Sequence, residues 1–188
     1  MTDVIAARTL RPDMPFALAA SETLAAQLAT VRVWARFLPQ ADRPHEHHQM
    51  RIAIKRLRYG IDAFANVLPA DALACVPALK SIQDALGELH DSDVLFASIE
   101  ATLFPMQSGR KRRGNEAKRA RAQRQRTSLE SLLSITAAER DAHHTRTLAI
   151  WQTLIASAAL APLDHAVIAL AQLPSSAATQ PRTEESSS

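Results

Sequence analysis

The chain has 188 residues, which is enough for one ordinary domain and too few for two. Only four glycines and 4% aromatic residues argue against an all-β fold, because strands favour aromatic side chains and their turns favour glycine. Helix-forming residues dominate and 47% of the chain is apolar, so we expect an all-α protein with a substantial core. The single cysteine, Cys75, excludes an internal disulfide framework and is expected in the core.

The net charge of +3 conceals an uneven distribution. Residues 109–126 hold nine Lys/Arg and one acidic residue, whereas the segments on either side are slightly acidic overall. This concentration predicts a polyanionic partner. Residues 1–14 lack the apolar run of a secretory signal, and the apolar stretch Leu148 to Leu160 is too short to span a bilayer. We therefore expect a cytoplasmic protein that does not associate with a membrane.

Apolar residues recur at helical spacing along most of the chain. Helices are expected from Asp13 to near Pro39, from 42–44 to near Pro69, from 71–77 to about Phe104, from Thr136 to about Leu160 and from Leu163 to Leu173. Thr136 and Glu139 form the capping-box pattern that would open the fourth of these. The predicted fold is an antiparallel bundle of about five to six helices with a basic face over residues 13–173. Residues 1–12 are expected to be flexible and residues 174–188 disordered.

The second helix combines an apolar stripe with a cationic side. At about 100° per residue, His48, Arg51, Lys55 and Arg58 fall together opposite the apolar stripe, and Arg56 lies farther round. Like charges three or four residues apart repel one another by a few tenths of a kcal/mol per pair, and a bound multivalent anion would relieve that repulsion. Arginine, lysine and histidine all donate hydrogen bonds to phosphate oxygens. A merely solvated face is the alternative interpretation.

The third helix contains a glycine and a pair of aspartates that call for an explanation. Gly87 predicts a close helix crossing, because glycine inside a helix costs about 1 kcal/mol relative to alanine. Asp91 and Asp93 have ligand chemistry for a metal ion, but an isolated Asp-x-Asp pair is weak evidence for a metal site. We expect both carboxylates to pair with basic side chains and hold them in place.

Together, these two segments resemble the CHAD family, the conserved histidine α-helical domain. The resemblance rests on His-x-x-Arg-x-x-x-Lys-Arg-x-Arg-Tyr from His48 and Leu-Gly-x-x-His-Asp-x-Asp-Val from Leu86, and it is densest over 44–100. It implies a helical bundle that binds inorganic polyphosphate and associates with polyphosphate granules. By motif position, the resemblance assigns binding to His48, Arg51, Lys55, Arg56, Arg58 and Lys80, and an orienting role to Asp91 and Asp93.

CHAD proteins commonly contain two such halves, and this chain departs from that pattern. His143 and Arg146 repeat the His-x-x-Arg start, but Ile150 and Trp151 stand where Lys-Arg would follow. The chain therefore resembles a single-motif member. A homodimer would supply a second basic helix, and a monomer that binds along one open face is the competing expectation.

The basic segment 109–126 is a second candidate surface. Its charges surround a helix on all sides, which suits a flexible basic arm for a polyanion better than a precise site. It lacks interleaved aromatic residues, so base stacking is not expected. A solvated linker, a nucleic-acid-binding module and an adaptor for an acidic protein remain alternatives. The candidate phosphate ligands in this segment are Arg110, Arg113, Lys118, Arg121 and Arg124.

Enzymatic chemistry finds little support in the sequence. There is no glycine-rich phosphate loop and no serine-centred elbow. His45, His47 and His48 are close in sequence, but no cysteine or well-spaced carboxylate completes a metal site. A phosphate-transfer enzyme that uses Asp91 and Asp93 with Mg²⁺ is the remaining enzymatic alternative. We expect a non-enzymatic, cofactor-free polyphosphate binder.

Overall fold

The computed structural model describes residues 14–108 and 116–173, and every regular element within these ranges is helical. The all-α prediction is confirmed. The elements in chain order are α1 (Phe16–Ala35), α2 (Pro44–Ala63), the 3-10 turn η1 (Ala65–Val67), α3 (Ala70–Leu73), α4 (Val76–Ser108), α5 (Glu116–Ala156) and α6 (Ala161–Gln172).

A hydrophobic core joins α1, α2, α6, the first half of α4 and the end of α5. Leu24 of α1, Ile54 of α2 and Leu79 of α4 are all fully buried in it. The apolar stripes that predict these helices face one another, because burying them removes the most apolar surface from water. Ser21 of α1 donates a hydrogen bond to the carbonyl of Val167 of α6 at 2.7 Å, which fixes the two outer helices together.

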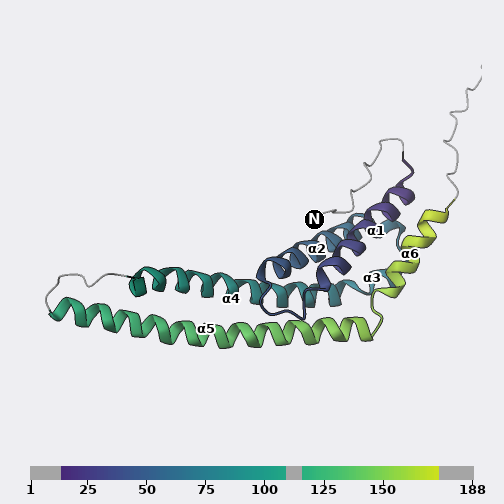
Figure 1. Ribbon diagram of the computed structural model, residues 1–188. Coiled ribbons are helices and arrows are strands. Elements are labelled where there is room, and N and C mark those ends of the chain that lie inside the picture. The colour runs from purple at the N-terminus through teal and green to yellow at the C-terminus, as the bar shows by residue number, and fades with distance from the viewer. Residues whose placement is uncertain (1–13, 109–115, 174–188) are drawn as a thin grey trace, which may run out of the picture.

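The two longest helices form an antiparallel hairpin that projects beyond the rest of the bundle (Figure 1). The helix α4 has 33 residues and α5 has 41, so both are longer than the 20-residue helices α1 and α2. Ile99, Leu103 and Thr136 are buried in the projecting part. We call residues 92–108 and 116–139 the arm.

Helix boundaries differ from the sequence predictions in several places. The second helix ends at Ala63 rather than near Pro69, because η1 and α3 turn the chain before α4 begins. The helix predicted to end at Phe104 continues to Ser108, with Pro105 in its last turn. A proline near a helix end disrupts only a hydrogen bond that water can replace. Asp13, residues 1–12 and residues 174–188 lie outside the described ranges.

The predicted helix start at Thr136 is wrong. Thr136 lies inside the continuous helix α5 and is only 1% exposed. A capping box acts only where the chain before it leaves the helix, and no proline or glycine interrupts α5 upstream of Thr136. At its other end α5 stops at Ala156, four residues before the predicted Leu160, and Ala158 adopts a left-handed φ of 52°.

None of the helices in the described ranges is by itself long and apolar enough to cross a bilayer. Only α5 and α6 taken together pass such a test of length and composition, and they are bent by 56° relative to one another.

Candidate functional site

The basic side of α2 lies along α4, which runs antiparallel to it. The rings of His48 and His90 stack with centroids 4.3 Å apart. Nη1 of Arg58 donates a hydrogen bond to Oε1 of Gln83 at 3.0 Å. Contacts with α4 therefore hold both ends of this side of α2 in place. We call His48, Arg51, Lys55 and Arg58 the basic row.

Between these two contacts, Arg51 crosses α4 at Gly87. Its Nε atom lies 3.6 Å from the position that a β-carbon on Gly87 would occupy. The close crossing expected at this glycine is therefore a contact between a side chain of α2 and the backbone of α4. Lys55 is exposed, and its Nζ lies 5.7 Å from the centroid of the Tyr59 ring.

The positive charge of the basic row is not neutralised within the described part of the chain. No carboxylate there forms an ion pair with Arg51, Lys55 or Arg58. By contrast, Arg32 pairs with Asp164 at 2.6 Å and Arg140 with Asp93 at 2.5 Å. The Nε atoms of Arg51 and Arg58 are buried without a hydrogen-bond partner among the described residues. The oxygen atoms of an anionic ligand would supply the negative charge and the hydrogen-bond acceptors that these cations lack.

His48 is the titratable member of the row. Burial lowers its pKa below the ordinary value, and the neighbouring His90, Arg51 and His45 lower that pKa further. The neutral imidazole is therefore favoured in the free protein near neutral pH. An anion bound beside His48 would favour the protonated form, because opposite charges raise the pKa of a base.

The other predicted ligands on α2 and α4 occupy more open positions. Arg56 is exposed and lies farther round α2 than the row. Lys80 pairs with Asp84 at 3.1 Å, and both side chains are more than half exposed. An exposed pair of this kind contributes about 1 kcal/mol or less, so a polyanion can compete for the lysine. Lys80 is one helical turn from Gln83, which bonds Arg58.

Asp93 pairs with a basic side chain, Arg140 of α5, which is not part of the basic row. It accepts a hydrogen bond from Nε of Arg140 on α5, and Nη2 of the same arginine donates to the carbonyl of Ala41 at 2.5 Å. Asp93 therefore fixes α5 and the turn before α2, and does not contact the basic row. Asp91 is exposed and forms no ion pair within the described ranges.

The partial repeat of the motif on α5 is occupied by internal contacts. Arg146 donates to Glu88 of α4 at 2.6 Å, and Nδ1 of His143 lies 3.4 Å from the same carboxylate. A ring nitrogen of His144 bonds the carbonyl of Leu38 at 2.8 Å. These contacts neutralise the second His-x-x-Arg pattern, so it does not form a second basic row.

His47 and His48, which are adjacent near the start of α2, contact different parts of the structure. His47 is buried beside His144, with ring centroids 5.4 Å apart, and bonds the carbonyl of Phe37 at 3.3 Å. His48 turns instead to His90. Within the described ranges no group of three or more His, Cys, Asp and Glu side chains is placed to hold a metal ion.

The described part of the basic segment, residues 116–126, forms the start of α5 at the far end of the arm (Figure 1). Arg110 and Arg113 are outside the described ranges, and Lys118, Arg121 and Arg124 are exposed on the first turns of α5. Arg121 and Arg124 line an open groove with Met106 of α4. Met106 is about 24 Å along α4 from His90, at a rise of about 1.5 Å per residue, so the structure does not bring the arm and the basic row into one site.

Sequence reasoning missed three residues that position this region. His90 and Gln83 support His48 and Arg58, and each lies in the motif segment of α4, where helical spacing could have placed it on the face toward α2. Arg140 had no such signal, because its partner Asp93 is 47 residues away in the sequence.

Comparison with protein families gives one match. The model of the CHAD domain family matches residues 2–100, which include α1, α2 and most of α4. The match does not include α5 or α6. Searches of curated proteins and of solved structures each return no significant match. The matched residues cover slightly more than half of the chain and contain the whole basic row, and the protein therefore belongs to the CHAD domain family.

Proposed function

We propose that this protein binds inorganic polyphosphate through the basic row of α2 and does so without catalysis. One observation carries the proposal: the row presents aligned cations that have no carboxylate partner within the described ranges. Side chains three and four residues apart on a helix are about 5–6 Å from one another, which suits a ligand with regularly repeated charge. Membership of the CHAD family supports the same ligand class.

The affinity would come from many phosphate contacts of modest strength. Polyphosphate has no base edges to read, so neutralisation of charge and release of counterions dominate binding. Lys80 adds positive potential near the row, and the exposed cations Lys118, Arg121 and Arg124 form a separate positive surface on the arm. The place of action that follows from this proposal is the cytoplasm, at polyphosphate granules.

A competition titration tests the ligand. Labelled polyphosphate is bound to the full chain, and unlabelled polyphosphate, single-stranded DNA, duplex DNA and RNA compete at matched phosphate concentration and salt. Polyphosphate is expected to displace the label at about tenfold lower concentration than any nucleic acid. Equal or tighter binding of a nucleic acid would overturn the proposal in favour of a nucleic-acid module.

Two matched variants locate the site. Arg51→Gln/Lys55→Gln/Arg58→Gln removes three charges from the row, and Arg119→Gln/Arg121→Gln/Arg124→Gln removes the same number from the arm. We expect the first variant to weaken polyphosphate binding about a hundredfold and the second about tenfold or less. Equal losses would show that binding follows net charge alone and would refute the assignment to α2.

A further inference from the structure

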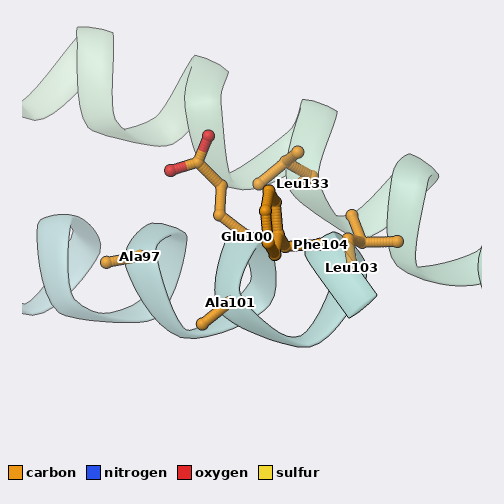
Figure 2. Close-up of a pocket in the computed structure, with 6 residues that line it drawn as sticks. All are labelled: Ala97, Glu100, Ala101, Leu103, Phe104 and Leu133. Atoms are coloured by element: carbon orange, nitrogen blue, oxygen red, sulfur yellow. The ribbon is translucent and has the colours of Figure 1, made fainter. Parts of the chain in front are cut away.

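The middle of the arm separates two groups of cations. Residues 91–108 of α4 contain no Lys, Arg or His, and neither do residues 127–139 of α5. The acidic residues of these two stretches are Asp91, Asp93, Glu100, Glu130 and Glu139. Figure 2 shows part of this gap, where the labelled side chains are apolar except for the carboxylate of Glu100. A polyanion therefore meets the basic row and the arm cations as two separate sites.

The second site is a groove between the start of α5 and the end of α4. Its volume of about 550 Å³ is within the range of about 300–1,000 Å³ that is typical of small-ligand sites. Arg121 and Arg124 lie three residues apart on one side of α5 and line the groove together with Gln125 and Ser128. Neither arginine forms an ion pair with a carboxylate within residues 14–108 and 116–173. The groove therefore combines two guanidinium groups with amide and hydroxyl donors, which all bind phosphate oxygens.

We propose that one polyphosphate chain binds the basic row and this groove of the same protein molecule together, so that the protein selects long chains over short ones. The inference rests on the proposed function. Met106 in the groove is about 24 Å along α4 from His90, which contacts the near end of the row. A chain shorter than this gap occupies one site at a time, whereas a longer chain bridges both.

A single continuous helix fixes the separation between the two sites. The helix α4 runs from Val76 to Ser108 and packs against both α2 and α5. Thr102, which also lines the groove, is about 120° round α4 from His90 at 100° per residue. A bridging chain therefore passes partly round α4, and it has to be longer than the straight distance along the helix.

The gain from bridging follows from effective concentration. A chain that is held at the row presents its free end to the groove at an effective concentration of about 1 mM. A groove that binds phosphates with a dissociation constant of about 0.1 mM then raises the affinity about tenfold. The gain requires a chain that spans the gap, and it is greatest where the length of the chain matches the span.

Titrations of the full chain with two ligands test the bridging. Triphosphate is far shorter than the gap, and a polyphosphate of about 20 phosphates is longer than it. Arg121→Gln/Arg124→Gln should lose about tenfold in affinity for the long chain. Its affinity for triphosphate should stay within about twofold of wild type, because salt screens charges at this distance from the row. For the long chain, the slope of log affinity against log salt should also be shallower by about 1–2 in this variant, since fewer counterions are released.

Arg119→Gln/Arg126→Gln is the matched control. It removes two charges from the same part of α5, but each of its residues is about 200° round the helix from one of the groove arginines. The control should keep its affinity for the long chain to within about twofold, and circular dichroism checks that both variants fold. Equal losses of long-chain affinity in the two variants would overturn the proposal, as would equal losses for the two ligands in Arg121→Gln/Arg124→Gln.

Sedimentation separates bridging within one molecule from bridging between molecules. With the long chain in excess, we expect complexes of one protein and one chain. Complexes that always contain two proteins would show that the row and the groove of different molecules share the chain, and would refute the proposal. Binding of both ligands that depends on the basic row but not on the groove would refute the bridging alone. A wild type that binds neither ligand would refute the proposed function, and the bridging with it.

Discussion

Arg51 lies against the backbone of α4 at Gly87, with its Nε atom 3.6 Å from where a β-carbon on that glycine would stand. That separation is an ordinary van der Waals contact, so a methyl group would touch the guanidinium without displacing it. A longer side chain at the same position would occupy the space that Arg51 now fills. Substitutions at residue 87 therefore vary the position of Arg51 without removing its charge.

Gly87→Ala is expected to raise the free energy of unfolding by about 0.5–1 kcal/mol, because alanine is the better helix former and its methyl group fits. Polyphosphate affinity should stay within about twofold of wild type. Gly87→Leu should displace Arg51 and weaken binding by about tenfold. Urea unfolding and a binding titration measure the two effects. Unchanged affinity in Gly87→Leu would show that the position of Arg51 is unimportant.

The variant Arg51→Gln/Lys55→Gln/Arg58→Gln should keep its helicity and most of its stability. Loss of the contact from Arg58 to Gln83 is offset by relief of the repulsion along the row. We expect the free energy of unfolding to change by less than about 1 kcal/mol, measured by urea unfolding followed by circular dichroism. A loss of about 3 kcal/mol or more would mean that the row is structural.

Arg140 should matter far more for stability than Arg146, although both form an ion pair with a carboxylate of α4. The Arg140 and Asp93 side chains are 20% and 8% exposed, whereas the Arg146 and Glu88 side chains are 61% and 43% exposed. Arg140→Met is expected to cost about 3 kcal/mol, since it leaves Asp93 buried without its partner. Arg146→Met should cost less than about 1 kcal/mol. Equal losses in thermal and urea unfolding would contradict this ranking.

Acidification should destabilise the free protein through His47 and His48. Burial lowers both pKa values below 6.5; the carbonyl of Phe37 and Asp93 raise that of His47, and His144 and Arg140 lower it. Between these lowered pKa values and pH 6.5, the unfolded chain therefore binds more protons than the folded one. The contribution of the two histidines to the free energy of unfolding is fully present above pH 6.5 and is lost as the pH falls through this window. Urea unfolding at about pH 7.5 and 5.5 should show a smaller loss in His47→Gln than in wild type.

Acidification should strengthen polyphosphate binding over the same range. His48 is neutral in the free protein at pH 7, and a bound anion favours its protonated form. Affinity is therefore expected to rise between about pH 7.5 and 5.5 by a larger factor in wild type than in His48→Gln. An identical pH dependence in the two proteins would exclude His48 from the binding site.

The helices of the bundle and the basic row were predictable because both depend on local periodicity. The apolar stripe of α2, which includes Met50, Ile54 and Leu57, is fully buried, and the cations on the other side of the helix follow from geometry alone. The length of α5 was not predictable. Thr136 and Glu139 satisfy a local rule for a helix start, but the helix continues because nothing upstream interrupts it.

Contacts between segments that are distant in the sequence could not be predicted from it. The pairing of Asp93 with Arg140 and that of Glu88 with Arg146 depend on the register of α4 against α5, which no single-helix pattern fixes. The same register places residues 116–126, the described part of the basic segment, far from the row. The sequence predicted polyanion binding at both surfaces but could not give the distance between them, because local patterns do not show how far α4 extends beyond α2.

A single helix, α5, passes through two very different environments. Near Arg140 and Leu154 it is tied to the turn before α2 and to the core, whereas its first turns are exposed and α4 is the neighbour that they pack against. Its backbone amides should accordingly exchange with deuterium on widely different timescales along one uninterrupted element, because opening the arm exposes little apolar surface and opening the other half requires the core to separate. The boundary between fast and slow exchange should fall near Thr136, where no sequence signal ends the helix.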